Sequence, residues 1–215
     1  MSDPRSPANR PRKERKENAD KRRTQIIDAT MRSIIQNGLS RTTLATVANE
    51  AGLSQGVAVF YFKSKGGLLI ETMREQYRRY EAHWTGYLAK ADPDPLAQLV
   101  AIIEADFAPE ICNPDQLALW FAFWGEQSFT PQYAEISGEF DRNRSEAIRQ
   151  LCRTLFADQP DSNPDRIGDW IDTLTDGFWQ KLHLFPGTLT PEHAVASTLD
   201  LVAELLPQHA RHLRR

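Results

Sequence analysis

Residues 42–69 read T-T-L-A-T-V-A-N-E-A-G-L-S-Q-G-V-A-V-F-Y-F-K-S-K-G-G-L-L. The spacing of the apolar residues predicts one helix over 44–51 and another over 55–62, and Gly52 allows a tight turn between them. Two short helices joined through A-G-L-S have the proportions of a helix-turn-helix. This stretch therefore predicts a small unit that lays its second helix against nucleic acid.

The second helix of this unit must pack on its neighbours with one side and present the other side outward. The inner side is expected to comprise Val57, Ala58 and Phe62. On the outer side, Gln55 can hydrogen-bond base edges, Gly56 permits close approach, and Val59 or Phe60 can touch a thymine methyl group. This side is therefore the predicted reading surface.

Phosphate contacts are expected at the ends of the unit. Thr43, the candidate cap of the first helix, can bond one phosphate, and Ser54 is the candidate cap of the second helix. Lys63 and Lys65 lie at the junction with the next helix, where an ammonium and helix N-terminal amides can together hold another phosphate. The full set of predicted DNA contacts is Thr43, Ser54, Gln55, Gly56, Val59, Tyr61, Lys63 and Lys65.

Charge is divided unevenly along the chain. Through Arg79 there are 16 Lys plus Arg and 8 Asp plus Glu, a balance of +8. From Tyr80 onward the counts are 10 and 21, a balance of −11, and the two parts sum to the net charge of −3. A basic head on an acidic body is expected where only the head meets a polyanion. No basic amphipathic helix with an exposed apolar face is evident, so nucleic acid is favoured over acidic lipid.

Helical patterns account for the rest of the chain, and we expect an all-α protein. One helix is expected from Thr24 to Asn37 and a long one from Ser64 or Lys65 to about Lys90. Prolines then divide the remainder into segments of helical length. These predicted helices are 95–107, 114–129, 133–156, 164–185 and 191–206. No stretch alternates with period two over enough residues to argue for a sheet.

Composition suggests three parts. Residues 1–20 hold proline, serine and charge but almost nothing to bury, which predicts a flexible basic arm or, equally, a tail without a role. Residues 21–66 form the predicted helix-turn-helix domain, and 67–215 form a larger helical domain. Within the latter, the apolar faces of helices 133–156 and 164–185 can pair with a second copy as a four-helix bundle or pack in their own core.

Several classes of protein are disfavoured. No apolar stretch reaches the length of a membrane span, and no signal-type apolar run follows the basic N-terminus, so we expect a cytoplasmic protein. The chain has no G-x-S-x-G, no P-loop and no His and Cys at metal spacing, so neither an enzyme nor a metal or cofactor site is expected. Cys112 and Cys152 are expected to be reduced, buried thiols.

Two aromatic stretches stand out in the second part, L-A-L-W-F-A-F-W-G-E (117–126) and T-D-G-F-W-Q-K (175–181). Tryptophan rings beside carboxylates suit a quaternary ammonium, because the rings attract the cation and the carboxylate supplies charge without requiring a hydrogen bond. Plain core packing is the alternative. The predicted ligand contacts are Asp106, Phe107, Trp120, Phe123, Trp124, Glu126, Asp176 and Trp179.

The 42–69 run closely resembles the DNA-binding signature of TetR-family repressors, which have a helix-turn-helix ending in aromatic residues, then Lys, two residues and Leu-Leu. W-F-A-F-W and T-D-G-F-W-Q-K are similar to segments of BetI-type repressors within that family. The resemblance implies a homodimer on a palindromic DNA operator, with a ligand-binding and dimerisation domain that responds to choline in glycine betaine metabolism. A regulator of an unrelated small hydrophobic or cationic ligand, or a dimeric DNA-binding protein without an effector, stays open.

Overall fold

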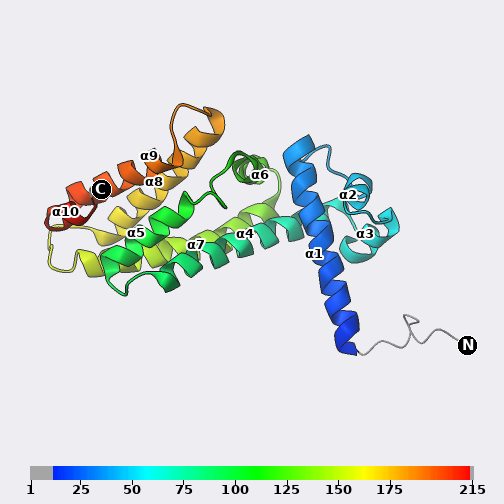
Figure 1. Cartoon of the computed structure of the whole chain (residues 1–215), viewed down its shortest axis with the longest axis horizontal. Helices are drawn as coiled ribbons and strands as arrows, with labels where there is room; N and C mark the ends of the chain where they lie inside the picture. Colours follow the sequence, from blue (N-terminus) through cyan, green and yellow to red (C-terminus); the bar gives the residue numbers. More distant parts are fainter. Residues whose placement is uncertain (1–11, 214–215) are drawn as a thin grey trace, which may run out of the picture. The chain divides into compact units, whose positions relative to one another are not determined.

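The computed structural model describes residues 12–213, with side chains from Lys16 onward, and within that range it contains helices and no strand. The all-α expectation is confirmed. The chain divides into two compact units, the first ending at Glu75 and the second beginning at Gln76. Figure 1 labels the helices of both units.

The first unit contains α1 (Arg12–Asn37), α2 (Leu44–Glu50), α3 (Gln55–Phe62) and the beginning of α4 (Lys65–Lys90). α1 packs against α2, and α2 packs against α3. These helices surround a small apolar core whose buried members include Ile26, Ile27, Ile34, Val47, Ala48, Ala58, Phe62, Leu68, Leu69 and Met73. The helix-turn-helix is therefore supported by one helix on each side of it in the sequence.

α1 begins earlier than expected. Residues 12–20 are helical rather than an arm, whereas residues 1–11 lie outside the described part of the chain. The segment R-K-E-R-K-E-N-A-D has no apolar pattern, but Arg, Lys, Glu and Ala have high helix propensity. A helix nucleated in the core can extend through such residues.

The turns of the first unit follow from a few local features. Thr43 caps α2 as expected, through a reciprocal pair of bonds with Thr46. Gly52 has a φ of +65°, a left-handed conformation that favours glycine, and Ser54 occupies the cap position of α3 without a capping bond from its side chain. Lys63 ends α3 with a φ of +65°, which is rare for a residue with a side chain.

The second unit is a bundle of helices. It contains the end of α4, then α5 (Pro95–Asp106), α6 (Pro114–Trp124), α7 (Pro131–Leu155), α8 (Pro164–Leu184), α9 (Pro191–Leu205), the 3₁₀ turn Pro207–His209 and α10 (Ala210–Leu213). α7 packs against α5 and α8, and α8 also packs against α6 and α9. In Figure 1, α5, α7, α8 and α9 run roughly alongside one another.

Each of the helices α5 to α9 begins with proline. The preceding residue is a polar cap, and in four cases its side chain accepts a hydrogen bond from a backbone N–H of the first turn. Thr130, before α7, occupies the cap position without that bond. Proline suits the first helical position because its missing N–H would have no partner there. This repeated pairing sets the start of every one of these helices.

The apolar faces of α7 and α8 are largely used within the chain. Ile136 and Ile148 of α7 and Ile171 and Phe178 of α8 are buried. For these residues the structure shows packing in their own core, the alternative left open above. Trp170 of α8, by contrast, is 46% exposed.

Candidate DNA-binding surface and aromatic cavity

The outer side of α3 carries polar and apolar groups open to solvent. Gln55, Gly56 and Val59 are exposed, while Ala58 and Phe62 on the opposite side are buried. The division of the helix into two sides thus follows the expected pattern for these residues, whereas Val57, expected on the inner side, is only half-buried. The most exposed apolar residue on it is Phe60, with 68% of its surface accessible.

Basic groups surround the aromatic end of α3. The Lys63 ammonium donates a hydrogen bond to the Phe60 carbonyl at 2.8 Å and lies 5.2 Å from the centre of the Phe60 ring. The Arg23 guanidinium lies 5.2 Å from the Phe62 ring and pairs with Glu71. Exposed Lys63 is therefore placed where it can meet a phosphate beside the exposed ring.

Two of the predicted phosphate contacts also make bonds within the chain. The Lys65 ammonium donates to the carbonyls of Leu39 and Ser40 at 2.9 and 2.8 Å, which ties the beginning of α4 to the turn after α1. The Thr43 hydroxyl accepts from the Thr46 amide at 3.1 Å. Lys65 is thus a positioning group for this turn, whatever else it contacts.

A shallow groove of about 460 Å³ runs beside α3. It is lined by Arg22, Leu53, Ser54, Gly56, Val57, Phe60 and Tyr61. Arg22 comes from α1 and was not among the predicted contacts, because it lies in a run of charges whose orientation the sequence does not reveal. It adds a cation to the surface that holds Tyr61 and Gly56.

An aromatic cavity lies inside the second unit. Its volume is about 90 Å³, whereas a single water needs about 10–15 Å³, so it has room for a small organic cation. Four helices, α4, α6, α7 and α8, contribute its walls. The lining residues are Tyr77, Tyr80, Trp120, Trp124, Asp141, Arg144, Ser145, Asp172, Asp176 and Trp179.

Three tryptophans form a compact group in this cavity. The ring centres of Trp120 and Trp124 are 5.9 Å apart, and the centre of Trp179 lies 6.0 and 6.2 Å from them. Tyr80 lies edge-on to Trp120 and Trp179, with both pairs of ring centres 5.6 Å apart. The three tryptophans come from two separate stretches of the sequence, 117–126 and 175–181, and they line the same cavity.

A buried arginine neutralises part of the acidic charge beside the cavity. Arg144 of α7 forms ion pairs with Asp106 and Asp172, and Tyr80 donates to Asp106 at 2.7 Å. Burial lowers the pKa of Arg144, but the neighbouring carboxylates, with Asp106 foremost, more than reverse this and hold the pKa raised. Asp106 is therefore committed to Arg144 and Tyr80 and does not line the cavity.

Two other carboxylates line the cavity, and neither forms an ion pair within the described part of the chain. Desolvation raises the pKa of Asp176 to about 7, although the residue as a whole is open to solvent. Desolvation likewise raises the pKa of Asp141 to about 6, with the charge of Asp172 adding to the effect. A cation placed among the rings would stabilise the ionised form of both carboxyl groups.

The other predicted ligand residues lie elsewhere. Phe107 packs edge-on against Phe178, with ring centres 6.3 Å apart, and buried Phe123 packs against Tyr133 at 5.4 Å. Glu126 is exposed, because α6 ends at Trp124 and not at 129 as expected. None of Phe107, Phe123 and Glu126 lines the cavity.

The cavity also uses residues that sequence reasoning did not select. Tyr77 and Tyr80 share one face of α4, and Asp141 and Arg144 share one face of α7. Helical spacing is the signal that pairs each set. Only the packing of α4 and α7 beside α6 and α8 turns those faces toward the tryptophans.

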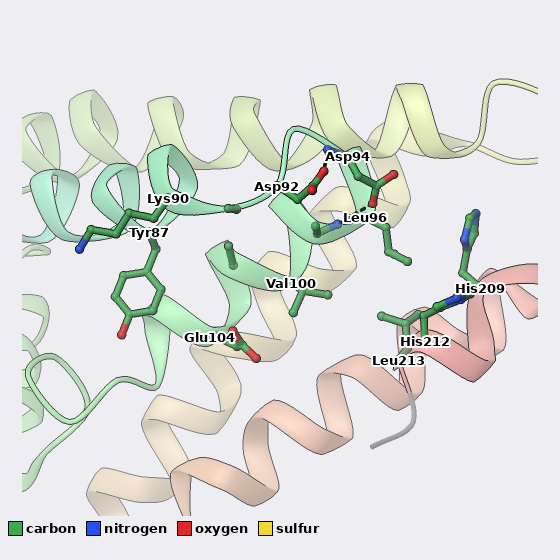
Figure 2. A pocket seen from close by; sticks show the side chains of 13 residues that line it. Tyr87, Lys90, Asp92, Asp94, Leu96, Val100, Glu104, His209, His212 and Leu213 are labelled. Atoms are coloured by element: carbon green, nitrogen blue, oxygen red, sulfur yellow. Dashed lines mark hydrogen bonds between the residues drawn. The ribbon is translucent and has the colours of Figure 1, made fainter.

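A larger cavity of about 780 Å³ lies near the end of the described chain, between the end of α4, α5 and α10 (Figure 2). Val100 and Leu213 contribute to an apolar wall. Two of its acids are occupied in capping, since Asp92 accepts from the Asp94 amide and Asp94 from the Ala97 amide. Because it lacks a group of rings around an unpaired carboxylate, the smaller aromatic cavity is the better candidate for a cation.

The described residues hold neither a metal-binding cluster nor a helix suited to a membrane. No three His, Cys, Asp or Glu side chains in residues 12–213 are grouped so as to hold a metal ion. In the same part of the chain, no helix combines the length and apolar character needed to cross a membrane.

Known proteins match the two units in succession. Residues 26–72 match the bacterial regulatory proteins of the tetR family, and residues 95–207 match the C-terminal domain of BetI-type transcriptional repressors. The HTH-type transcriptional regulator BetI of Burkholderia thailandensis is 32% identical over 189 residues, which cover 88% of this chain and 95% of that protein. The BetI regulator of Paraburkholderia phymatum is 33% identical with the same coverage.

Solved structures of similar fold include two bacterial regulators. One from Pseudomonas aeruginosa PAO1 has a TM-score of 0.79 at 23% identity and covers 91% of this chain and 95% of its own. Another, from Saccharomonospora viridis in complex with choline, has a TM-score of 0.76 at 19% identity and covers 85% and 96%. Likeness at this level of identity shows a shared fold.

Proposed function

Because this chain belongs to the TetR family of transcriptional regulators and carries a BetI-type C-terminal domain, we propose that it represses genes of choline and glycine betaine metabolism and leaves its operator when choline or a related quaternary ammonium binds. The resemblance seen in the sequence is thereby confirmed at the level of the family, and the chain is a regulator and not an enzyme. The choice of choline rests on one observation, the aromatic cavity with its unpaired carboxylates.

The chemistry of the cavity suits a quaternary ammonium. Trp120, Trp124 and Trp179 offer ring surfaces to methyl groups that carry the charge, and Asp176 supplies the opposite charge. A methylated cation donates no hydrogen bond, so the cavity need not supply an acceptor to each face of it. The choline-bound regulator of similar fold supports this assignment.

DNA recognition is proposed for the outer side of α3 and its flanks. Gln55 and Val59 would read base edges, and Lys63 would bind a phosphate, with Thr43, Ser54, Gly56, Tyr61 and Lys65 as the other predicted contacts. A dimer would place two copies of α3 in successive major grooves about 34–36 Å apart, which implies a palindromic operator. Such a repressor works in the cytoplasm, where its DNA lies.

The members of this family act as dimers, and we propose that α8 and α9 form the contact. A groove of about 430 Å³ on these helices is lined by Trp170, Thr173, Leu174, Gly177, Phe178, Lys181 and Leu201. Its walls are mainly apolar, and they include the exposed ring of Trp170. A second copy would cover this surface.

Titration calorimetry with choline and its neutral isostere 3,3-dimethylbutan-1-ol tests the ligand. The isostere has nearly the same shape but no charge, so choline should bind at least about a hundredfold more tightly if rings and carboxylates hold a cation. Equal affinity for the two would contradict a cation site. Binding of neither would leave a TetR regulator of an unrelated ligand, for which the 780 Å³ cavity is the next place to search.

A further inference from the structure

Tyr77 belongs to α4, and its side chain forms part of the wall of the aromatic cavity. Its ring stacks on Phe140 with centres 5.4 Å apart and lies edge-on to Trp120 at 4.7 Å. Its hydroxyl accepts a hydrogen bond from the Trp124 indole at 3.3 Å and donates one to the Asp141 carboxylate at 3.5 Å. One hydroxyl thus joins α4 to a wall of the cavity on α6 and to a cavity carboxylate on α7.

We propose that Tyr77 is the positioning residue that passes the occupancy of the cavity to α4, by a hydrogen bond to Asp141 that tightens when a cation binds. This inference rests on the proposed function. It assigns to Tyr77 the coupling between ligand and DNA and leaves the holding of the ligand to the rings and to Asp176.

The geometry of the bond supports this role. At 3.5 Å, the contact between Tyr77 and Asp141 is at the outer limit of a hydrogen bond, and so it contributes little in this structure. With its pKa raised to about 6 by burial, Asp141 is partly protonated near that pH when the cavity is empty. A cation in the cavity favours its ionised form, and an ionised carboxylate draws a hydroxyl closer than a neutral one. A Tyr77 that moves toward Asp141 carries with it the backbone of α4.

α4 is suited to carry that displacement. It is one unbroken helix from Lys65 to Lys90, and its residues up to Glu75 belong to the first unit. Gln76, next to Tyr77, is buried, and neither end of its side-chain amide has a hydrogen-bond partner among the described residues. A buried amide without hydrogen-bond partners is energetically costly. A second position of α4 in which the Gln76 amide finds partners would therefore be stabilised relative to this one.

The test compares the wild-type protein with Tyr77→Phe, which keeps the ring and removes the hydroxyl. Calorimetry gives the affinity for choline. Fluorescence anisotropy gives the affinity for a duplex selected from a random pool by the wild-type protein, with and without saturating choline. The ratio of the two duplex dissociation constants is the coupling factor.

Because Tyr77 lines the cavity, the choline affinity of Tyr77→Phe is measured first and choline is then kept saturating. We expect unchanged duplex binding without choline and a coupling factor about fivefold smaller, the value of one hydrogen bond. Tyr133→Phe is the matched control, because it removes the hydroxyl of another buried tyrosine that does not line the cavity. It should leave the coupling factor unchanged.

A coupling factor equal to wild type in Tyr77→Phe would overturn the inference while leaving the proposed function intact. Asp141→Asn gives a second test, since Tyr77→Phe should cause no further loss of coupling in that background. Independent losses in the two variants would also overturn it. If wild-type protein binds choline without any change in duplex affinity, or does not bind it, the proposed function fails and this inference with it.

Discussion

Asp176 gives the cavity an unusual response to pH. Its pKa of about 7 lies above its ordinary value, so below pH 7 the carboxyl is mostly protonated and lacks the charge that a cation needs. Choline affinity should therefore rise about tenfold from pH 6 to pH 8, with Arg144, Asp106, Asp141 and Asp172 as the charges that act on it. Calorimetry at several pH values measures this, and Asp176→Asn should bind weakly with a flatter profile.

The stability of the empty protein should follow the same group with the opposite sign. A carboxyl whose folded pKa is raised binds its proton more tightly in the folded state, so it favours folding at low pH and loses that contribution as pH rises to about 7. The melting temperature without choline should therefore fall between pH 5 and pH 8, and saturating choline should reduce the fall. A flat or rising profile in both conditions would contradict the assignment.

Gly67 is required by a close approach of two backbone segments. A Cβ atom at this position would lie 2.5 Å from the carbonyl oxygen of Phe62. Because this oxygen belongs to the backbone, it cannot easily move away. Gly67→Ala should therefore destabilise the first unit by about 1–3 kcal/mol. Neighbouring Gly66 offers a matched control, because a Cβ atom there would come no closer than 3.9 Å to its nearest neighbour, the Ser64 hydroxyl oxygen. Thermal denaturation should show Gly66→Ala unchanged or slightly stabilised.

Single residues of the cavity were predictable only in part. Helical spacing places Trp120 and Trp124 on one face of α6, and Asp176 and Trp179 on one face of α8. All four residues line the cavity. The ion pair of Asp106 could not be predicted from the sequence, since its partner Arg144 is 38 residues away. Which of several neighbouring carboxylates receives the arginine depends on how helices pack, and spacing within one helix carries no such information.

At the scale of the element, α3 should separate base reading from phosphate binding. Gln55→Ala is expected to change operator preference at one position of each half-site, by about 1–3 kcal/mol. Lys63→Gln should weaken binding to all DNA sequences alike, and the slope of log affinity against log salt concentration should fall by about one. Selection from random duplexes, followed by salt titration of the winners, measures both. Preference untouched in Gln55→Ala would show that this side of α3 does not face the bases.

Helix positions were far more predictable than helix neighbours. The ends of α3 and α4 lie where the sequence placed them, and α5, α8 and α9 differ by one residue at their ends, because capping residues and prolines act locally. α6 ends five residues early, at Trp124, where Gly125 follows. α1 begins early because its charged first turns have propensity without an apolar pattern, and pattern is what located the other helices.

For the whole molecule, association should depend on the groove of α8 and α9. Trp170→Asp puts a charge on the mainly apolar surface proposed for the dimer, and should weaken association at least about thirtyfold, or about 2 kcal/mol. Analytical ultracentrifugation measures this, and duplex affinity should fall in parallel. Phe129→Asp is the control, because Phe129 is another exposed aromatic residue but lies outside that groove. A Trp170→Asp protein that stays dimeric would place the contact elsewhere.

The prolines that begin α5 to α9 also govern how the molecule recovers from denaturation. All peptide bonds in the described chain are trans, yet in an unfolded chain each of these five bonds is cis in about 10–30% of molecules. At about 20% apiece, roughly two-thirds of fully equilibrated unfolded molecules carry a wrong isomer in at least one of these five bonds. Those molecules must wait tens of seconds to isomerise, so a prolyl isomerase should speed their refolding, whereas a brief pulse of denaturant should leave most chains able to refold at once.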